Sequence, residues 1–120
     1  ILIVCTLALM ESLTACDSKF DGSRTGNDSE FIMEYHVLNK TDTQDLIAES
    51  GDTIRGKIIV NKGNLSVKIQ KDDGDSIYEN NGISVSSEFD VEVNEGGTYT
   101  VSVTGEKAKG SVSFTVVTNQ

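Results

Sequence analysis

Leu65-Ser-Val-Lys-Ile-Gln-Lys71 decides the fold, because apolar and polar side chains alternate along it. Successive side chains of an extended strand point to opposite faces, so Leu65, Val67 and Ile69 share one face. The polar side chains between them share the other face. This stretch therefore predicts a strand in a sheet that has one buried face and one solvated face.

The same period of two recurs on both sides of this stretch. Strands of this kind are expected at residues 31–38, 44–49, 53–60, 76–79, 84–93, 98–104 and 111–117. Turn-forming residues separate them, including a hairpin turn at 61–64 and a last loop at 105–110. About eight strands with turns roughly every 8–12 residues predict an all-β chain. A small antiparallel β-sandwich is the expected architecture, and a closed barrel is the alternative.

Four stretches in the second half of the chain follow one another in an order seen in other sandwich domains. They are Gly63-Asn-Leu-Ser-Val-Lys-Ile69, Asp75-Ser-Ile-Tyr78, Ser87-Glu-Phe-Asp-Val91 and Gly97-Thr-Tyr-Thr-Val-Ser-Val103. This order resembles that of GOLD domains and of immunoglobulin-like domains. The resemblance implies a β-sandwich and a role in binding proteins or lipids. The cysteine pair of the GOLD-domain cargo receptors is absent here, so a cargo-receptor role does not carry over.

The beginning of the chain has the pattern of a secretion signal. Residues 1–10 are almost entirely apolar and stop at Glu11, a run shorter than the roughly 20 residues of a membrane-spanning helix. Leu13-Thr-Ala-Cys16 then matches the lipobox of bacterial lipoprotein signals, and the whole resembles small lipoproteins of gut Firmicutes. The resemblance implies cleavage before Cys16, diacylglycerol on its sulfur, and a location on the extracytoplasmic face of the cell membrane. An ordinary signal, or a core strand with an incidental cysteine, is the alternative.

These patterns divide the chain into three parts. Residues 1–15 are expected to be the signal peptide, which lacks its usual start. Residues 16–30 are expected to be the lipidated cysteine and a flexible tether, because Phe20 is the one large apolar residue after Cys16 in that stretch. Residues 31–120 are expected to form the sandwich. Cys5 would leave with the signal, so cysteine catalysis and cysteine metal sites are excluded for the mature chain.

The charge of the chain is strongly acidic. Ten Lys and Arg residues stand against nineteen Asp and Glu residues, for a net charge of −9. A chain with this balance repels phosphate groups, so we expect neither nucleic acid nor anionic lipid headgroups as direct ligands. Lys107 and Lys109 form a small basic cluster in the last loop, where we expect a solvated loop rather than a contact with phosphate or headgroups.

Asp72, Asp73 and Asp75 crowd one turn and are the candidates for a calcium site, because calcium is bound by several carboxylate oxygens. The glycine and the distal glutamate of an EF-hand loop are not at the required spacing. Asp and Gly are also the ordinary residues of surface turns. A surface turn is therefore the expected structure, and no cofactor is expected.

No catalytic residue is expected. His36, the single histidine, follows Tyr35 and should point away from the core. No serine lies in a G-x-S-x-G motif, and one histidine without cysteines does not make a conventional zinc site. Glu88, Asp90 and Glu92 follow the solvated face of one strand, where acidic residues are ordinary. They are therefore no evidence for the carboxylate pair of a glycosidase.

The sequence therefore predicts a non-enzymatic module that binds a protein or peptide at the cell surface, through a sheet edge. The alternative is a module for cell-wall glycan or for calcium, and a hydrolase that uses carboxylates is a third hypothesis. A glycan module needs an exposed aromatic ring. Tryptophan is absent, and Tyr35 and Tyr99 fall on core faces, so Tyr78 is the one candidate platform.

Overall fold

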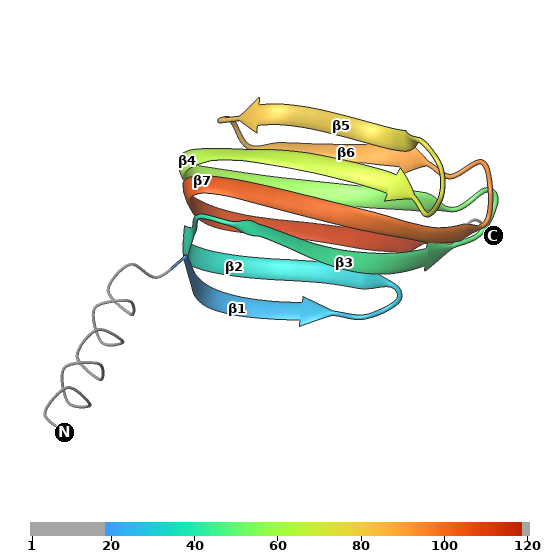
Figure 1. Cartoon of the computed structure of the whole chain (residues 1–120), viewed down its shortest axis with the longest axis horizontal. Helices are drawn as coiled ribbons and strands as arrows, with labels where there is room; N and C mark the ends of the chain where they lie inside the picture. The colour runs from blue at the N-terminus through green and yellow to red at the C-terminus, as the bar shows by residue number, and fades with distance from the viewer. Residues whose placement is uncertain (1–18, 119–120) are drawn as a thin grey trace, which may run out of the picture.

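A computed structural model describes residues 19–118, and every regular element in this range is a strand (Figure 1). The strands are β1 (Phe20–Gly26), β2 (Glu30–Leu38), β3 (Thr41–Ala48), β4 (Thr53–Lys71), β5 (Ser76–Ile83), β6 (Ser87–Glu92) and β7 (Gly97–Val117). All pairings between them are antiparallel. The predicted all-β class is confirmed. The predicted signal peptide and Cys16 lie outside the described residues. Within residues 19–118, no helix could cross a membrane.

Two long strands, β4 and β7, hold the molecule together because they belong to both layers of a sandwich. The first half of β4 pairs with β6 and with the second half of β7, to which β2 and then β1 are added. The second half of β4 pairs with β5 and with the first half of β7, to which β3 is added. We call these the five-strand layer and the four-strand layer. The predicted antiparallel β-sandwich is confirmed.

The strand count differs from the prediction at the corners of the sandwich. The predicted hairpin turn at 61–64 lies inside β4, and the predicted loop at 105–110 lies inside β7. The ladder between them continues through register shifts between Val60 and Lys62 and between Lys62 and Asn64. Gly63, with φ of 69°, and Gly110, with φ of 148°, supply the bend. Glycine here marks a corner where a strand passes between layers, so two pairs of predicted strands are single strands and eight become six. The unpredicted β1 brings the number in the described residues to seven.

The structure also differs from the prediction of a flexible tether over residues 16–30. Phe20–Gly26 forms β1 and pairs along its length with β2. Six of its seven residues are exposed, so its sequence has no apolar face to reveal it. An edge strand of this kind is held by backbone hydrogen bonds to one neighbour, which any side chain permits.

The core lies between the inner faces of the two layers, where the apolar positions of the alternating pattern meet. Its largest fully buried side chains are Tyr99, Phe31, Phe114, Met33, Leu38, Leu46, Ile54, Ile58, Leu65, Ile69, Val67 and Val93. The rings of Phe31 and Phe114 are 6.3 Å apart, which joins β2 to β7. The predictions that Tyr35 and Tyr99 face the core are confirmed.

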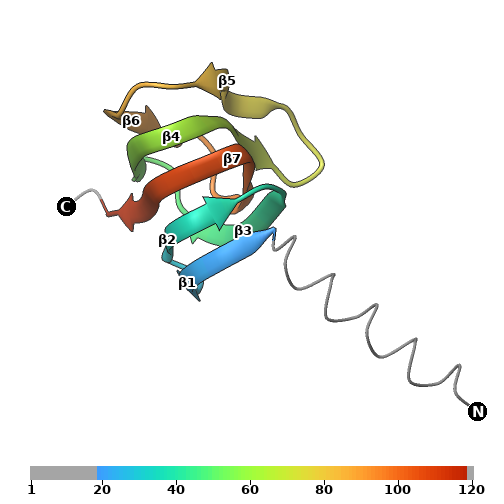
Figure 2. The ribbon, with the colours of Figure 1, turned by 90° about the vertical axis from the view of Figure 1, so that its left-hand side faces the viewer.

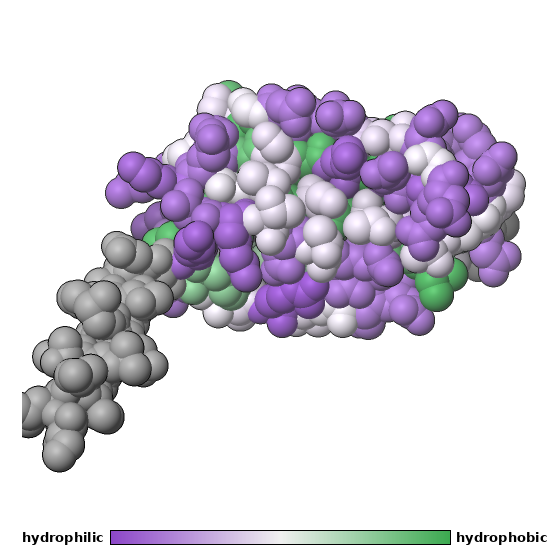
Figure 3. Space-filling view, in the orientation of Figure 1, coloured by the Kyte–Doolittle hydropathy of each residue, from purple (hydrophilic) through white to green (hydrophobic). Residues whose placement is uncertain are grey.

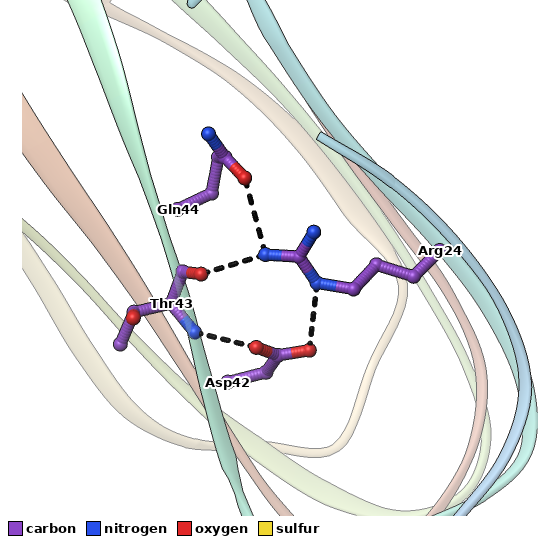
Figure 4. A network of polar contacts seen from close by, with 4 residues as sticks. All are labelled: Arg24, Asp42, Thr43 and Gln44. Atoms are coloured by element: carbon purple, nitrogen blue, oxygen red, sulfur yellow. Dashed lines mark hydrogen bonds and ion pairs between the residues drawn. The ribbon is translucent and has the colours of Figure 1, made fainter. Parts of the chain in front are cut away.

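Arg24 closes one open side of the sandwich by joining β1 to β3 (Figure 4). Its Nε donates to Asp42 Oδ2 at 3.0 Å, and its Nη2 donates to the carbonyl of Thr43 at 2.8 Å and to Gln44 Oε1 at 3.1 Å. The guanidinium carbon also lies 4.8 Å from the centre of the Phe31 ring. These contacts occupy part of the outer edge of β3 and cover that side of the core.

Tyr78 closes the opposite side by stacking on Phe89. Their ring centres are 4.3 Å apart and the planes differ by 10°, which joins β5 of one layer to β6 of the other. Phe89 in turn covers Gly56, where any side chain would collide with the ring. One face of the Tyr78 ring is therefore used in packing, which weakens the prediction that it serves as a sugar platform.

Two buried tyrosines are expected to respond in opposite ways to removal of their hydroxyl groups. The Tyr35 hydroxyl is buried without a hydrogen-bond partner among the described residues, so Tyr35→Phe should raise the free energy of unfolding by about 1–2 kcal/mol. The Tyr99 hydroxyl donates to the carbonyl of Glu95, so Tyr99→Phe should lower it by about 1 kcal/mol. Urea unfolding of both variants measures this, and equal signs would contradict the assignment.

Tyr35 also makes the free energy of unfolding depend on pH in the alkaline range. Burial raises the pKa of Tyr35 to about 12, compared with about 10 in an unfolded chain. The folded state therefore favours the neutral form of Tyr35. The stability that this adds is fully present below about pH 10 and is lost as the pH rises through about 12. The unfolding free energy of Tyr35→Phe should therefore fall less over this window than that of the unaltered chain.

Candidate binding surface

A depression of about 460 Å³ opens on the outer face of the five-strand layer. Four neighbouring strands contribute to it: β1, β2, β7 and β4. The lining residues are Gly22, Ser23, Glu34, Tyr35, His36, Ile59, Asn61, Lys109, Gly110 and Ser111. Its walls present hydroxyl, amide, carboxylate, imidazole and ammonium groups, so it offers hydrogen-bond donors and acceptors of both charge signs.

The depression forms where the strand ladder is irregular. Register shifts occur between Asp21 and Gly22, between Tyr35 and Leu38, and between Val60 and Lys62. Bulges of this kind bend a strand and redirect its side chains. Glycine is needed at two of the lining positions, because a methyl group on Gly22 or Gly110 would collide with a neighbouring backbone carbonyl.

Ile59 is the apolar side chain that this surface leaves open to solvent, with 37% of its area exposed. A second depression of about 310 Å³ lies on the other side of it, lined by Lys57, Ile58, Ile59, Ser86, Ser87 and Glu88. The Ser86 hydroxyl accepts a hydrogen bond of 2.9 Å from the backbone N–H of Val60, which holds the β5–β6 connection in place. We call the lining of these two depressions the Ile59 surface.

His36 is exposed, as predicted, and it lies in the first depression beside Glu34. No hydrogen bond joins it to a serine or a carboxylate within residues 19–118. A histidine that activates a nucleophile needs such a partner on each ring nitrogen. The arrangement therefore offers a polar contact and does not form a catalytic triad.

The acidic turn remains a surface turn in the structure. Asp73 and Asp75 line a depression of about 410 Å³ that also contains Lys71 and Glu95, and the Lys71 ammonium lies 3.9 Å from the Glu95 carboxylate. Asp72 accepts a hydrogen bond of 3.4 Å from the Thr100 hydroxyl. In the part of the chain that the structure describes, no three acidic, histidine or cysteine residues are grouped to hold a metal ion.

The acidic residues of β6 lie on the solvated face, as expected, where Glu88, Asp90 and Glu92 are all exposed. Arg55 donates to both Asp90 oxygens at 2.9 and 3.3 Å. The hydrogen bond from Arg55 lowers the pKa of Asp90, so this carboxylate is ionised at neutral pH. An ionised, paired carboxylate is unsuited to the general-acid role that a glycosidase requires.

The large apolar side chains that are exposed among the described residues are all aliphatic. They are Ile47 at 52%, Ile59 at 37%, Ile77 at 37% and Val85 at 73%. None of them offers the flat ring on which sugars stack. Figure 3 shows apolar surface only in small, separate areas of the face that it draws. Strict alternation places Ile59 on the polar face of its strand, so an apolar residue on that face is the one sequence signal of this surface.

Comparison with known proteins bears on the fold alone. No protein-family model matches this sequence, and no curated protein matches it either. The chain is similar to the crystal structure of PliG from Aeromonas hydrophila, a periplasmic inhibitor of g-type lysozyme, with a TM-score of 0.49 and 17% identity over 82% of this chain and 87% of that one. It is also similar to TmCBM61 in complex with β-1,4-galactotriose, with a TM-score of 0.38 and 17% identity over 80% and 66%. Neither likeness identifies what this chain binds.

Proposed function

We propose that this chain is a non-catalytic module, held on the extracytoplasmic face of a bacterial cell membrane by lipid on Cys16, that binds a protein partner through the Ile59 surface. The observation that supports the partner most directly is the position of Ile59. It is an exposed aliphatic side chain between two depressions whose walls are polar. An apolar centre inside a polar rim is the usual anatomy of a protein interface.

A partner that meets the face fits the structure better than one that adds a strand to an edge, which was the route expected from the sequence. Arg24 and the Asp28 carbonyl already engage the outer edge of β3. The exposed carboxylates of β6 discourage strand addition there. The pairing of β5 with β4 is interrupted by two register shifts, which makes β5 an irregular template.

Substitution of Ile59 tests the partner. Ile59→Asp places a charge at the centre of the surface and should weaken binding of the protein partner by about 10- to 100-fold. Ile47→Asp is the matched control, because Ile47 is also exposed but lies on the four-strand layer. The partner is identified by crosslinking in cells from a photoreactive residue at position 59, followed by mass spectrometry. Titration of the isolated partner then measures its affinity for both variants. Equal weakening by both substitutions would contradict the proposed surface.

Substitution of Cys16 tests the lipid attachment. The lipobox pattern Leu13-Thr-Ala-Cys16 supports the proposal, and the thioether to diacylglycerol can form at no other atom of that motif. Cys16→Ser should abolish incorporation of labelled palmitate and remove the chain from the membrane fraction. Cys5→Ser is the control and should leave both unchanged. Labelling that persists in Cys16→Ser would show that Cys16 carries no lipid.

A further inference from the structure

Five segments that are distant in the sequence meet at the end of the sandwich where β1 begins. Figures 1 and 2 show that the start of β1, the β2–β3 turn, the β5–β6 connection and the corners of β4 and β7 all lie at this end. The segments are residues 19–21, 36–40, 60–64, 83–87 and 104–110. The turns between the remaining strand ends lie at the opposite end of the molecule.

Backbone contacts fix these segments to one another. The N–H of Asn39 donates to the carbonyl of Lys19 at 2.7 Å, and the N–H of Gly105 donates to the carbonyl of Lys40 at 3.0 Å. The Asn39 side chain accepts a bond of 3.0 Å from the N–H of Lys107. In the ladder, Lys62 is the partner of Lys109. The lysines of this end are therefore held close together by the fold.

The two ends of the sandwich carry opposite charge. The end where β1 begins, which we call the basic end, has two carboxylates, Asp21 and Glu106, against five lysines: Lys19, Lys40, Lys62, Lys107 and Lys109. The opposite end, which we call the acidic end, has one cation, Lys71. Against it stand nine carboxylates: Asp28, Glu30, Glu49, Asp52, Asp72, Asp73, Asp75, Glu92 and Glu95. The net charge of −9 thus conceals a separation of charge along the strands.

Distances decide which of these charges a nearby surface would feel. A strand of eight or nine residues is about 30 Å long, whereas electrostatic interactions decay over about 8 Å at physiological salt. The acidic end therefore lies several screening lengths from anything that contacts the basic end. The net charge of the chain therefore does not by itself decide how this end interacts with anionic headgroups.

We propose that the basic end binds the anionic headgroups of the bilayer into which the lipid on Cys16 inserts, a proposal that rests on the proposed lipid attachment. Since β1 begins at Phe20, the four residues that lead from Cys16 to it reach at most about 14 Å. The basic end must then lie near the headgroups, and clusters of lysine there are attracted to anionic lipid. The sandwich would stand upright, with its acidic end outward.

The orientation can be measured on the lipidated chain in vesicles. A fluorophore is attached through Asn61→Cys at the basic end or Asp73→Cys at the acidic end, and energy transfer to an acceptor at the bilayer surface is recorded. Vesicles of phosphatidylcholine are compared with vesicles that also contain phosphatidylglycerol. With the anionic lipid, we expect high transfer from position 61, low transfer from position 73, and an orientational preference of about tenfold or more that salt removes.

Matched variants separate a local effect from a change in total charge. Lys19→Gln, Lys62→Gln and Lys107→Asn together should abolish the preference, and asparagine suits position 107 because its φ is 49°. Lys57→Gln, Lys68→Gln and Lys71→Gln remove the same charge elsewhere and should preserve it. Equal transfer from both labels in anionic vesicles, or equal loss in both triple variants, would overturn the proposal.

Failure of the lipid attachment gives a different result. Flotation with pure phosphatidylcholine vesicles reports the lipid alone, because those vesicles carry no net charge. A chain that does not float with them lacks the anchor, and the labels are then read with phosphatidylglycerol vesicles at low salt. Binding with position 61 nearest the bilayer would still support the basic end, and no binding would refute it.

Discussion

Phe114→Ala is expected to lower the free energy of unfolding by about 3–5 kcal/mol. Phe114 has no exposed area, and its ring lies 6.3 Å from that of Phe31 and 6.2 Å from that of Phe89. The substitution therefore removes the ring that joins β2, β7 and β6 and leaves a cavity between the layers. A domain of this size is stable by only about 5–15 kcal/mol, so the loss would bring it close to unfolding.

Urea unfolding of the full chain, followed by circular dichroism, measures this effect. Val85→Ala is the control, because Val85 is 73% exposed, and its change should stay within about 0.5 kcal/mol. A loss below about 1 kcal/mol for Phe114→Ala would mean that the Phe114 ring does not fill the space between the layers as described here.

Gly110→Ala is expected to destabilise the fold by about 3 kcal/mol or more. Two effects add at this position: its φ of 148° is unfavourable for an L-residue, and the new methyl group would collide with the carbonyl of Ile59. Relief of the collision requires the backbone to shift at the corner where β7 passes between layers. The first depression should deform with it, because Gly110 and Ile59 both line it.

Gly82→Ala separates the two effects. Gly82 also has a positive φ, of 66°, but a methyl group there would meet no atom within 4 Å. Only the conformational cost remains, so its loss should be about 1 kcal/mol. Chemical denaturation of both variants makes the comparison, and equal losses would show that the contact with the Ile59 carbonyl is unimportant.

Alternation predicted the strands wherever a strand has one buried face, as in 65–71 and 98–104. It failed where a strand depends on backbone pairing with its neighbour and not on an apolar face of its own. Gly63 and Gly110 look like turn residues in sequence, yet the backbone partner across the ladder keeps the strand continuous through the bend. β1 has almost no buried side chains, so no local pattern could reveal a strand that exists because β2 offers it hydrogen bonds.

The Ile59 surface and the basic end were harder to predict than the fold because the parts of each are distant in sequence. Lys19, Lys40, Lys62 and Lys107 have no common motif, and only the β2–β3 turn and the two corners bring them to one end. Asp72 and its neighbours, which do form a local cluster, make no metal-binding group within residues 19–118. Spacing in the sequence was therefore a poor guide to chemistry in this chain.

The pairing of β4 with β7 has a consequence for the order in which the chain folds. These strands are central to both layers, and their partners lie 28 residues apart at Lys71 and Tyr99 and 64 apart at Thr53 and Val117. A chain that emerges from a ribosome or an export channel N-terminus first cannot complete either layer until β7 has appeared. We therefore expect the polypeptide to stay unfolded, and so able to pass through a narrow channel, until its last strand is free.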